Sequence, residues 1–189
     1  MVDSHRFDVI VVGAGMVGGA FACLLARANP AVRIALIEAH QSDPFDPHTF
    51  DPRVAALTEK TRSIFERIGI WNKIVDKRSC AYKAMNVWDA EGTGRITFNC
   101  QQVQQPNLGH IVENTVLVST LAEHMQQQSN VEIFCPANVV DYQLQEDAIR
   151  LTLDNQSVLS AQLLIAADGA NSAVRGHFQF ATKQWDYGQ

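Results

Sequence analysis

The sequence, 189 residues long, predicts an α/β fold in which helices pack on a mainly parallel sheet, accompanied by an antiparallel β-meander. Two observations predict this fold. The β-branched run Val9 to Val12 leads through a glycine-rich turn into a helix-forming segment, about Met16 to Ala28, and then into a second apolar run, Ile34 to Ile37. Far down the chain, four more strand candidates follow one another between residues 131 and 167. The first pattern is that of a βαβ unit with parallel strands, and the second is typical of antiparallel pairing.

The turn after the first strand carries the pattern G-x-G-x-x-G in Gly13, Gly15 and Gly18. Gly13 permits the tight turn, Gly15 lets the backbone approach a pyrophosphate, and Gly18 allows the helix to pack close to the strand. Met16 and Val17 lie between these glycines at the start of the helix, where free N–H groups and the helix dipole favour phosphate. The five residues therefore predict a dinucleotide-binding site.

A carboxylate is placed to complete that site. Glu38 lies 20 residues after Gly18, at the end of the second strand, where it can accept hydrogen bonds from an adenosine ribose. An alternative interpretation is a signal anchor or membrane span, because Val9 to Ala26 is uncharged over 18 residues. The four glycines in this stretch, with Asp8 before it and Arg27 behind it, favour the βαβ unit and no transmembrane segment.

Composition and charge narrow the classes of function. The formal net charge is −5, the pI is near 5.6 and there is no block of lysine and arginine, so nucleic acid is not an expected partner. The four cysteines include no C-x-x-C and the six histidines no H-x-x-x-H, so no metal site is expected. Cys23 and Cys135 are expected to be buried thiols in a reducing compartment.

The middle of the chain predicts a loop, a helix and a hairpin. Three Asp-Pro pairs between residues 39 and 53 favour turns. From Thr58, a potential cap, apolar residues recur at helical spacing as far as Gly69, which suits a helix end. Two short runs, Met85–Trp88 and Arg95–Phe98, are separated by a turn that contains glycine and predict a β-hairpin.

A second helix is expected from about Thr115 to Gln128, with Asn114 as its N-cap. The strand candidates after it are Val131–Phe134, Asn138–Leu144, Ala148–Leu153 and Ser157–Ala167. The turns around Glu146-Asp147 and Asp154-Asn155 predict an antiparallel meander, which is followed by a last strand. The apolar residues of that strand, Leu163 to Ala167, are typical of a strand buried on both faces. That strand runs into Asp168-Gly169, which is either a simple turn or part of a ligand site, because ligands bind at strand ends in open α/β sheets.

Five segments together carry a resemblance to a known family. They are VIVVGAGMVGGAFACLLAR at 9–27, FDPRVAALTEKT at 50–61, RIGIW at 67–71, GHIVENTVL at 109–117 and AADGANSAVR at 166–175. In these segments the chain resembles the FAD-dependent aromatic hydroxylases of the para-hydroxybenzoate hydroxylase type. The pattern around Asp168 is specific to these monooxygenases, and GHIVEN narrows the match to the ubiquinone-biosynthesis branch.

The resemblance implies a Rossmann-like FAD-binding domain and assigns residues to the cofactor. Gly13, Gly15 and Gly18 would hold the FAD pyrophosphate, and Glu38 the adenosine ribose. Arg53 matches an arginine that reaches the phosphates and the ribityl region of FAD. Without the resemblance, Arg53 would be interpreted as a solvated loop residue.

The later segments imply further contacts. The stretch at Glu113 and Asn114 matches a segment beside the flavin, although helix capping would explain Asn114 nearly as well. Asp168 and Gly169 match the motif implicated in both FAD and NAD(P)H binding, and Arg175 matches its structural support.

The resemblance also implies a domain organisation. Residues 1–189 would be the N-terminal part of the FAD-binding domain, and residues 84–108 would contribute to an incomplete substrate domain with a second sheet. A third FAD motif and most of the substrate sheet follow later in the family. We therefore expect the chain to be roughly the N-terminal half of such an enzyme.

The implied enzyme is a monooxygenase that hydroxylates the aromatic ring of a polyprenyl phenol in ubiquinone biosynthesis, with FAD and NAD(P)H as cofactors. No residue of the chain is expected to act as a catalyst itself. The expected partners are the polyprenyl phenol, the missing C-terminal half and subunits of a quinone-biosynthesis complex. The expected location is the cytoplasm, with peripheral attachment to the inner membrane.

Two other functions remain open from the sequence. A nicotinamide-dependent dehydrogenase would share the glycine pattern, but the second strand is followed by a proline-rich loop rather than a regular alternation of strand and helix. A non-catalytic FAD-binding module could serve in the assembly of a quinone-synthesis complex.

Overall fold

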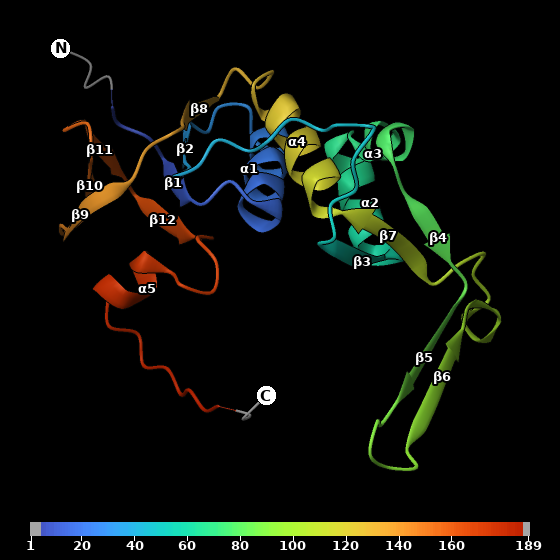
Figure 1. Ribbon diagram of the computed structural model, residues 1–189. Helices are drawn as coiled ribbons and strands as arrows, with labels where there is room; N and C mark the ends of the chain where they lie inside the picture. The colour runs from blue at the N-terminus through green and yellow to red at the C-terminus, as the bar shows by residue number, and fades with distance from the viewer. Residues whose placement is uncertain (1–4, 187–189) are drawn as a thin grey trace.

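The computed structural model describes residues 5–186, and residues 1–4 and 187–189 of the predicted domain lie outside the described part. The strands are β1 (Val9–Val12), β2 (Ile34–Ile37), β3 (Val54–Thr58), β4 (Cys80–Tyr82), β5 (Ala84–Trp88), β6 (Arg95–Asn99), β7 (Gly109–Glu113), β8 (Val131–Phe134), β9 (Val139–Leu144), β10 (Ile149–Leu153), β11 (Val158–Ala161) and β12 (Leu163–Ala166). The helices are α1 (Met16–Ala28), α2 (Glu59–Ile68), α3 (Trp71–Lys77), α4 (Asn114–Met125), α5 (Ala173–His177) and a 3-10 turn, η1 (Cys100–Val103). Figure 1 shows their arrangement.

Four strands form one parallel sheet in the order β12-β1-β2-β8. Val12 of β1 lies beside Ala166 of β12 on one side and beside Ile37 of β2 on the other. Because all the pairings are parallel, the carboxyl ends of these strands meet at one edge of the sheet. Glu38 and Asp168, which follow β2 and β12, are therefore brought to the same edge as the glycine turn.

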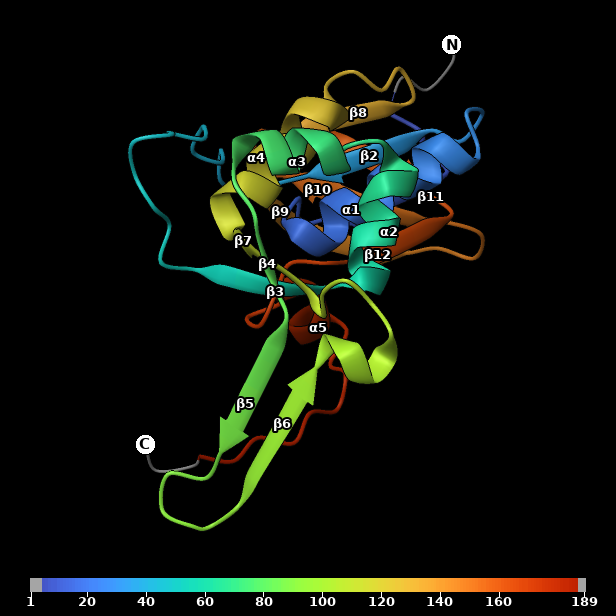
Figure 2. The ribbon, with the colours of Figure 1, turned by 90° about the vertical axis from the view of Figure 1, so that its right-hand side faces the viewer.

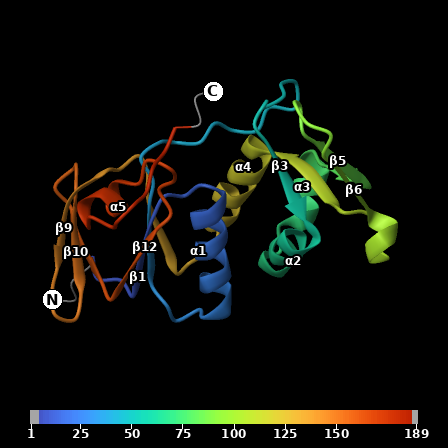
Figure 3. The ribbon, with the colours of Figure 1, turned by 90° about the horizontal axis from the view of Figure 1, so that it is seen from below.

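The parallel sheet is covered on both faces, which explains its apolar strands. Val9 and Val11 of β1 lie in a core with α1 and α4, whereas Ile10 between them packs against the meander. In β2, Ile34 and Leu36 join the helical side in the same alternation. Figure 3 shows α1 and α4 on one side of β1 and the strands β9 and β10 on the other.

The predicted antiparallel meander is confirmed and consists of β11-β10-β9. Val131–Phe134, predicted as a strand, is β8 and pairs in parallel with β2. The strand predicted over Ser157–Ala167 is two strands, β11 in the meander and β12 in the parallel sheet. Burial of β12 on both faces is also wrong: Leu163 is 49% exposed, because β12 is an edge strand of the sheet in the described chain.

A third sheet, β3-β7-β4, is antiparallel and was not predicted. Residues of α2, α3 and α4 share a core with Leu57 of β3 and Val112 of β7. Figure 2 shows the three helices and the strands of this sheet. The predicted caps of α2 are confirmed. The Thr61 N–H donates to Thr58 Oγ1 at 3.2 Å, and Gly69 ends the helix with a φ of 92°.

The predicted hairpin is confirmed as a separate two-stranded sheet, β5-β6, which projects away from the rest of the molecule (Figures 1 and 2). Met85 lies opposite Phe98 and Val87 opposite Ile96, so one face of the hairpin is apolar. All four side chains are exposed. The assignment of residues 84–108 to a substrate domain stays a prediction.

The two cysteines predicted to be buried differ in their surroundings. Cys23 of α1 is buried, and burial raises the pKa of its thiol to about 12. Cys135 is exposed because it follows the end of β8, outside the sheet, so the prediction of its burial is wrong.

The described part of the chain lacks two further features. None of its helices has the length and apolar character of a membrane span. Within residues 5–186, no group of three or more histidine, cysteine or acidic side chains is arranged to hold a metal ion.

Candidate functional site

The turn between β1 and α1 is built from glycines that leave no room for a side chain. Gly13 has a φ of 98°, and a Cβ there would lie 2.9 Å from the amide nitrogen of Asp168 and closer still to the carbonyl group of Ala167. A Cβ on Gly18 would overlap the carbonyl oxygen of Gly13. The close approach of β1, α1 and the end of β12 therefore requires glycine at both positions.

Gly15 differs from these two because the space around it is open. It is the N-cap of α1 with a φ of −63°, and a Cβ there would have no heavy atom within 4 Å. No side chain caps α1, and its first turn, which includes Met16 and Val17, contains no acidic residue. The N–H groups of this turn and the positive end of the helix dipole are therefore available to an anion.

Glu38 is held against the same turn. Its Oε2 accepts a hydrogen bond from the Ala14 N–H at 2.7 Å, and its Oε1 accepts one from the His40 N–H at 3.0 Å. A carboxylate oxygen can accept more than one hydrogen bond, so Glu38 keeps acceptor capacity for a ribose hydroxyl.

Asp168 reaches this edge from the end of β12, which is pinned to β1 by a hydrogen bond from the Ala167 N–H to the Val12 carbonyl oxygen at 2.7 Å. Its Oδ2 accepts from the Val174 N–H at 3.2 Å, whereas its buried Oδ1 has no hydrogen-bond partner among the described residues. Burial raises the pKa of Asp168, but hydrogen bonds from Ser172 and from backbone N–H groups outweigh burial, and the net pKa is lowered. Asp168 is therefore an ionised carboxylate beside the glycine turn, and its Oδ1 has no hydrogen-bond donor among the described residues.

A cavity of about 670 Å³ opens beside this edge. Its lining includes Ala14, Gly15, Glu38, residues 40–44, Ser119 of α4 and Cys135. The volume falls in the range of about 300–1,000 Å³ that is usual for small-molecule and cofactor sites.

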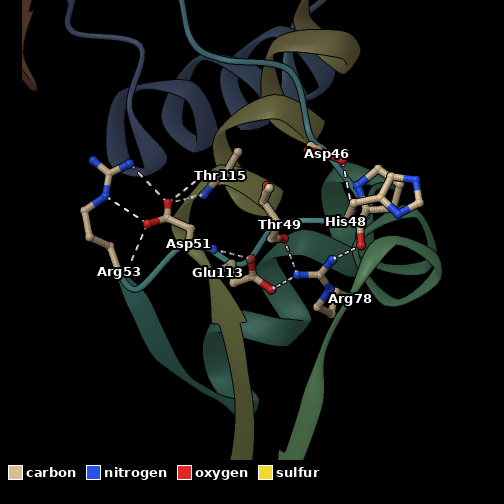
Figure 4. Close-up of polar contacts among 9 residues, drawn as sticks. Asp46, His48, Thr49, Asp51, Arg53, Arg78, Glu113 and Thr115 are labelled. Carbon is tan, nitrogen blue, oxygen red and sulfur yellow. Dashed lines mark hydrogen bonds and ion pairs between the residues drawn. The ribbon is translucent and has the colours of Figure 1, made fainter.

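Arg53 lies in a polar network at the start of α4 (Figure 4). Its Nε and Nη2 donate to the two carboxylate oxygens of Asp51, each at 3.1 Å. Asp51 Oδ2 also accepts from Thr115, through the N–H at 3.2 Å and the hydroxyl at 2.5 Å. The Asp51 N–H donates to Glu113 Oε2 at 2.8 Å, and Glu113 Oε1 accepts from Arg78 Nη1 at 2.8 Å. One chain of contacts thus joins Arg53 to β7 and to the residue after α3.

Arg78 holds the other side of the loop that carries Arg53. Its guanidinium donates to the carbonyl oxygens of Pro47 and Thr49, both at 2.8 Å. It also lies 3.9 Å from the centroid of the Phe50 ring, within the range of a cation–π contact. The proline-rich loop before β3 is therefore fixed by contacts with residues far along the chain.

The start of α4 differs from the prediction. Asn114 is the first helical residue and Glu113 is the N-cap, so the prediction of Asn114 as N-cap is wrong. The physical reason is that Asp51, from a distant loop, accepts from the Thr115 N–H and supplies the capping carboxylate. The Asn114 N–H donates instead to the carbonyl oxygen of Arg53 at 2.8 Å.

The predicted site residues fall into two groups. The residues at the carboxyl edge of the parallel sheet are Gly13, Gly15, Met16, Val17, Gly18, Glu38, Asp168 and Gly169. Arg53 and Asn114 form the other group, and within residues 5–186 no hydrogen bond joins it directly to the first. The packing of α1 on α4 links the two groups.

Sequence reasoning missed the residues that hold Arg53. The only local signal was an aspartate two positions before the arginine, Asp51. Thr115 lies 64 residues away from Asp51 and Glu113 lies 62 away, so no spacing in the sequence indicated their contact.

His110 of β7 is packed in the third sheet. Its ring centroid lies 4.8 Å from that of Trp71, and its Nδ1 lies 3.6 Å from Glu59 Oε1. Its side chain is 13% exposed. These contacts favour a packing role over contact with a substrate.

The fold and the carboxyl edge of its sheet define a nucleotide-cofactor-binding domain of the α/β class. The chain belongs to the FAD binding domain family, whose model matches residues 6–186.

Two relatives are similar over nearly the whole chain. The mitochondrial ubiquinone biosynthesis monooxygenase COQ6 of Danio rerio is 34% identical over 201 residues, covering 99% of this chain and 41% of that protein. The 3-demethoxyubiquinol 3-hydroxylase of Escherichia coli K12 is 32% identical over 183 residues, covering 96% and 46%. The chain therefore spans less than half the length of these relatives.

Solved structures confirm the predicted Rossmann-like fold. The p-nitrophenol 4-monooxygenase PnpA of Pseudomonas putida matches with a TM-score of 0.74 and 23% identity, covering 94% of this chain and 45% of that one. PqsL of Pseudomonas aeruginosa, described as a probable FAD-dependent monooxygenase, matches with a TM-score of 0.77 and 20% identity, covering 96% and 48%. At these identities the likeness concerns the fold alone.

The residues of the carboxyl edge fit an FAD molecule on three counts. The start of α1 is uncapped and open above Gly15, which suits a diphosphate. Glu38 keeps acceptor capacity beside the cavity, which suits an adenosine ribose. Asp168 as a residue is partly exposed and its lowered pKa keeps it ionised, which suits an acceptor for a hydroxyl group of the cofactor.

Proposed function

We propose that this chain is the N-terminal, FAD-binding part of a flavoprotein monooxygenase that hydroxylates the ring of a polyprenyl phenol in ubiquinone biosynthesis. The observation that carries the proposal is the meeting of Asp168, at the end of β12, with the glycine turn after β1. The names of the two relatives support the reaction, because both are ubiquinone-pathway enzymes.

Each residue of the carboxyl edge has a role in this proposal. The N–H groups at Gly15, Met16 and Val17 would bind the diphosphate, and Glu38 would accept from the adenosine ribose. The adenosine would extend into the cavity of about 670 Å³ that Glu38 and Gly15 line. Asp168, ionised at the end of β12, would accept from a cofactor hydroxyl.

The second group would act on the cofactor from the side of α4. Arg53 would donate to the diphosphate, and Gly169 and Asn114 would line the approach to the flavin. None of these side chains acts as a nucleophile or a proton-transfer group in the proposed reaction.

Bound FAD, reduced by NAD(P)H, would supply the oxygen chemistry, with one atom of O₂ entering the aromatic ring and the other leaving as water. The protein's share is to bind and orient the cofactor and to exclude water from it. We also propose that the hairpin β5-β6 belongs to the substrate domain, where its exposed apolar face would be covered.

The proposed partners are the polyprenyl phenol, the C-terminal half of the enzyme and subunits of a quinone-biosynthesis complex. We propose a cytoplasmic location with peripheral attachment at the inner membrane, since the substrate carries a lipid tail.

The test is reconstitution of the purified chain with FAD, removal of free cofactor, and measurement of the flavin spectrum and of NAD(P)H oxidation. Weak retention of FAD that improves when a relative's C-terminal half is added would support the proposal. Tight retention with full turnover by the chain alone would contradict the view that it is one part of the active enzyme. Retention without turnover, even with the added half, would favour a non-catalytic binding module, and selective binding of NAD(H) would favour a dehydrogenase.

A further inference from the structure

Arg53 and Asp51 form an ion pair with unequal exposure. The Arg53 side chain is 74% exposed, whereas that of Asp51 is 8% exposed. We propose that Asp51 is a positioning residue that holds Arg53 by one edge of its guanidinium, so that the other edge faces the diphosphate of the cofactor. This inference rests on the proposed function, since it takes FAD as the ligand of Arg53.

The geometry indicates that Asp51 fixes the Arg53 guanidinium in place without preventing it from binding a second anion. A guanidinium has five N–H donors in one plane. Asp51 takes two of them, one on Nε and one on Nη2, which leaves three on the exposed side of Arg53. A carboxylate bound along one edge fixes the plane of the group without blocking the opposite edge, which can bind a second anion.

Asp51 is itself fixed in place, as a positioning residue must be. Its Oδ2 accepts both the N–H and the hydroxyl of Thr115, and its N–H donates to Glu113. The backbone of Arg53 is tied to the same helix end, because its carbonyl oxygen accepts from the Asn114 N–H. The backbone of Arg53 is therefore fixed next to the start of α4.

The start of α4 is in turn linked to the glycine turn. α4 shares a core with α1, and a Cβ on Gly19 of α1 would lie 3.4 Å from the side chain of Leu121 in α4. Because α1 begins at the proposed diphosphate site, Asp51 connects Arg53 to the same rigid layer that carries Gly15. An arginine on a mobile loop would lack this connection.

Asp51 adds orientation rather than charge. The hydrogen bond from Arg53, followed by that from Thr115, holds the pKa of Asp51 well below its usual range, so the carboxylate is ionised at neutral pH. Its negative charge offsets that of Arg53, so the pair attracts an anion less than a free arginine would. If Asp51 mainly competed with the diphosphate, removing its charge would strengthen FAD binding, which is the opposite of what we expect.

The test compares Asp51→Asn, Arg53→Met and the double variant by titration of the whole chain with FAD, followed by flavin fluorescence. We expect each single variant to weaken FAD binding about tenfold, because one charge-assisted, oriented contact is lost. The double variant should bind no more weakly than Arg53→Met alone, because Asp51 acts through Arg53.

Asp46→Asn is the matched control. Asp46 lies in the same loop and accepts only the His48 N–H, at 2.9 Å, among the contacts of its carboxylate in the described chain. We expect its FAD affinity to equal that of the wild type. Thr115→Val removes only the hydroxyl that donates to Asp51, so we expect an intermediate loss of FAD affinity. This variant keeps the test valid if Asp51→Asn does not fold.

Tighter FAD binding by Asp51→Asn, or additive losses in the double variant, would overturn the proposal. A second readout needs no cofactor: the Nε–H resonance of Arg53 in NMR spectra, assigned by its absence in Arg53→Met. We expect Asp51→Asn to shift and broaden this resonance and Asp46→Asn to leave it unchanged. If the wild type binds no FAD even after a relative's C-terminal half is added, the proposed function fails, and the resonance alone then decides whether Asp51 holds Arg53.

Discussion

The glycine turn and the Arg53 loop are two parts of one candidate site, and they are built in opposite ways. The glycine turn is made of backbone, and its shape depends on the absence of side chains at Gly13 and Gly18. The Arg53 loop is made of side chains, and its shape depends on Asp51 and on Arg78. We therefore expect that adding atoms at Gly13 or Gly18 destabilises the glycine turn. Removing side-chain atoms from Asp51 or Arg78 should disrupt the Arg53 loop.

The largest effect is expected from Gly18→Ala. The new Cβ would overlap the carbonyl oxygen of Gly13, so β1 and α1 must move apart, at a cost of about 3 kcal/mol in the free energy of unfolding. Urea unfolding measures this cost. Gly176→Ala in α5 is the control, because a Cβ there meets nothing within 4 Å, and its unfolding free energy should be unchanged or slightly higher. Equal stability of the two variants would contradict the steric account of the turn.

The second-largest loss of stability is expected from Arg78→Met, in the network of side chains around Glu113. It leaves the Glu113 carboxylate, 9% exposed, without its charged partner, and two loop carbonyl groups without their donor. We expect the unfolding free energy to fall by about 2 kcal/mol, less than for a fully buried pair because Arg78 is partly exposed.

Arg62→Met is the matched comparison for that variant. Arg62 pairs with Glu59 and Glu66 on the surface of α2, and such exposed pairs contribute about 0–1 kcal/mol. A loss in Arg62→Met as large as that in Arg78→Met would show that the network around Glu113 contributes no more than surface charge pairs do.

The same contrast explains what the sequence could predict. The βαβ unit, with Glu38 at its end, and the caps of α2, Thr58 and Gly69, follow from residues close in the chain, and the structure has them as predicted. The apolar residues of these elements recur with the spacing of a strand or a helix, and the glycines and caps that end them are adjacent in the sequence. The sequence therefore indicated the backbone-built half of the site almost completely.

The sequence could not indicate which distant segments pair. The pattern of Val131–Phe134 predicts a strand but does not say that it pairs with β2 rather than β9. The strand Gly109–Glu113 runs into α4 without a turn, so no boundary marked it. The contacts of Asp51 with Thr115 and Glu113 depend on that unpredicted sheet, which is why the surroundings of Arg53 were missed.

Gly15→Ala sharpens the comparison, because it adds an atom where the backbone has room. The φ of −63° suits alanine and no heavy atom lies within 4 Å, so the unfolding free energy should change by less than about 0.5 kcal/mol. In the proposed function the methyl group would occupy the space of the diphosphate, and FAD affinity should fall by at least about tenfold. Unfolding curves and FAD titrations on the same preparation separate the two effects. If a folded Gly15→Ala variant bound FAD with the affinity of the wild type, the diphosphate could not lie at this turn.

The smallest effect is expected from the pH dependence of the Asp51–Arg53 pair. The pKa of Asp51 is lowered in the folded chain, so its contribution to stability is fully present above the usual aspartate pKa of about 3.9 and is lost as the pH falls below that value. The difference in unfolding free energy between wild type and Asp51→Asn should therefore be constant from about pH 5 to pH 8 and shrink in more acidic solution. It should be small throughout, because Arg53 is 74% exposed and solvent screens the pair. The cost of Gly18→Ala, which involves no titrating group, should not follow this acidic decline. If it did, the backbone-built and side-chain-built regions would not be independent, and the turn itself would depend on the charge of Asp51.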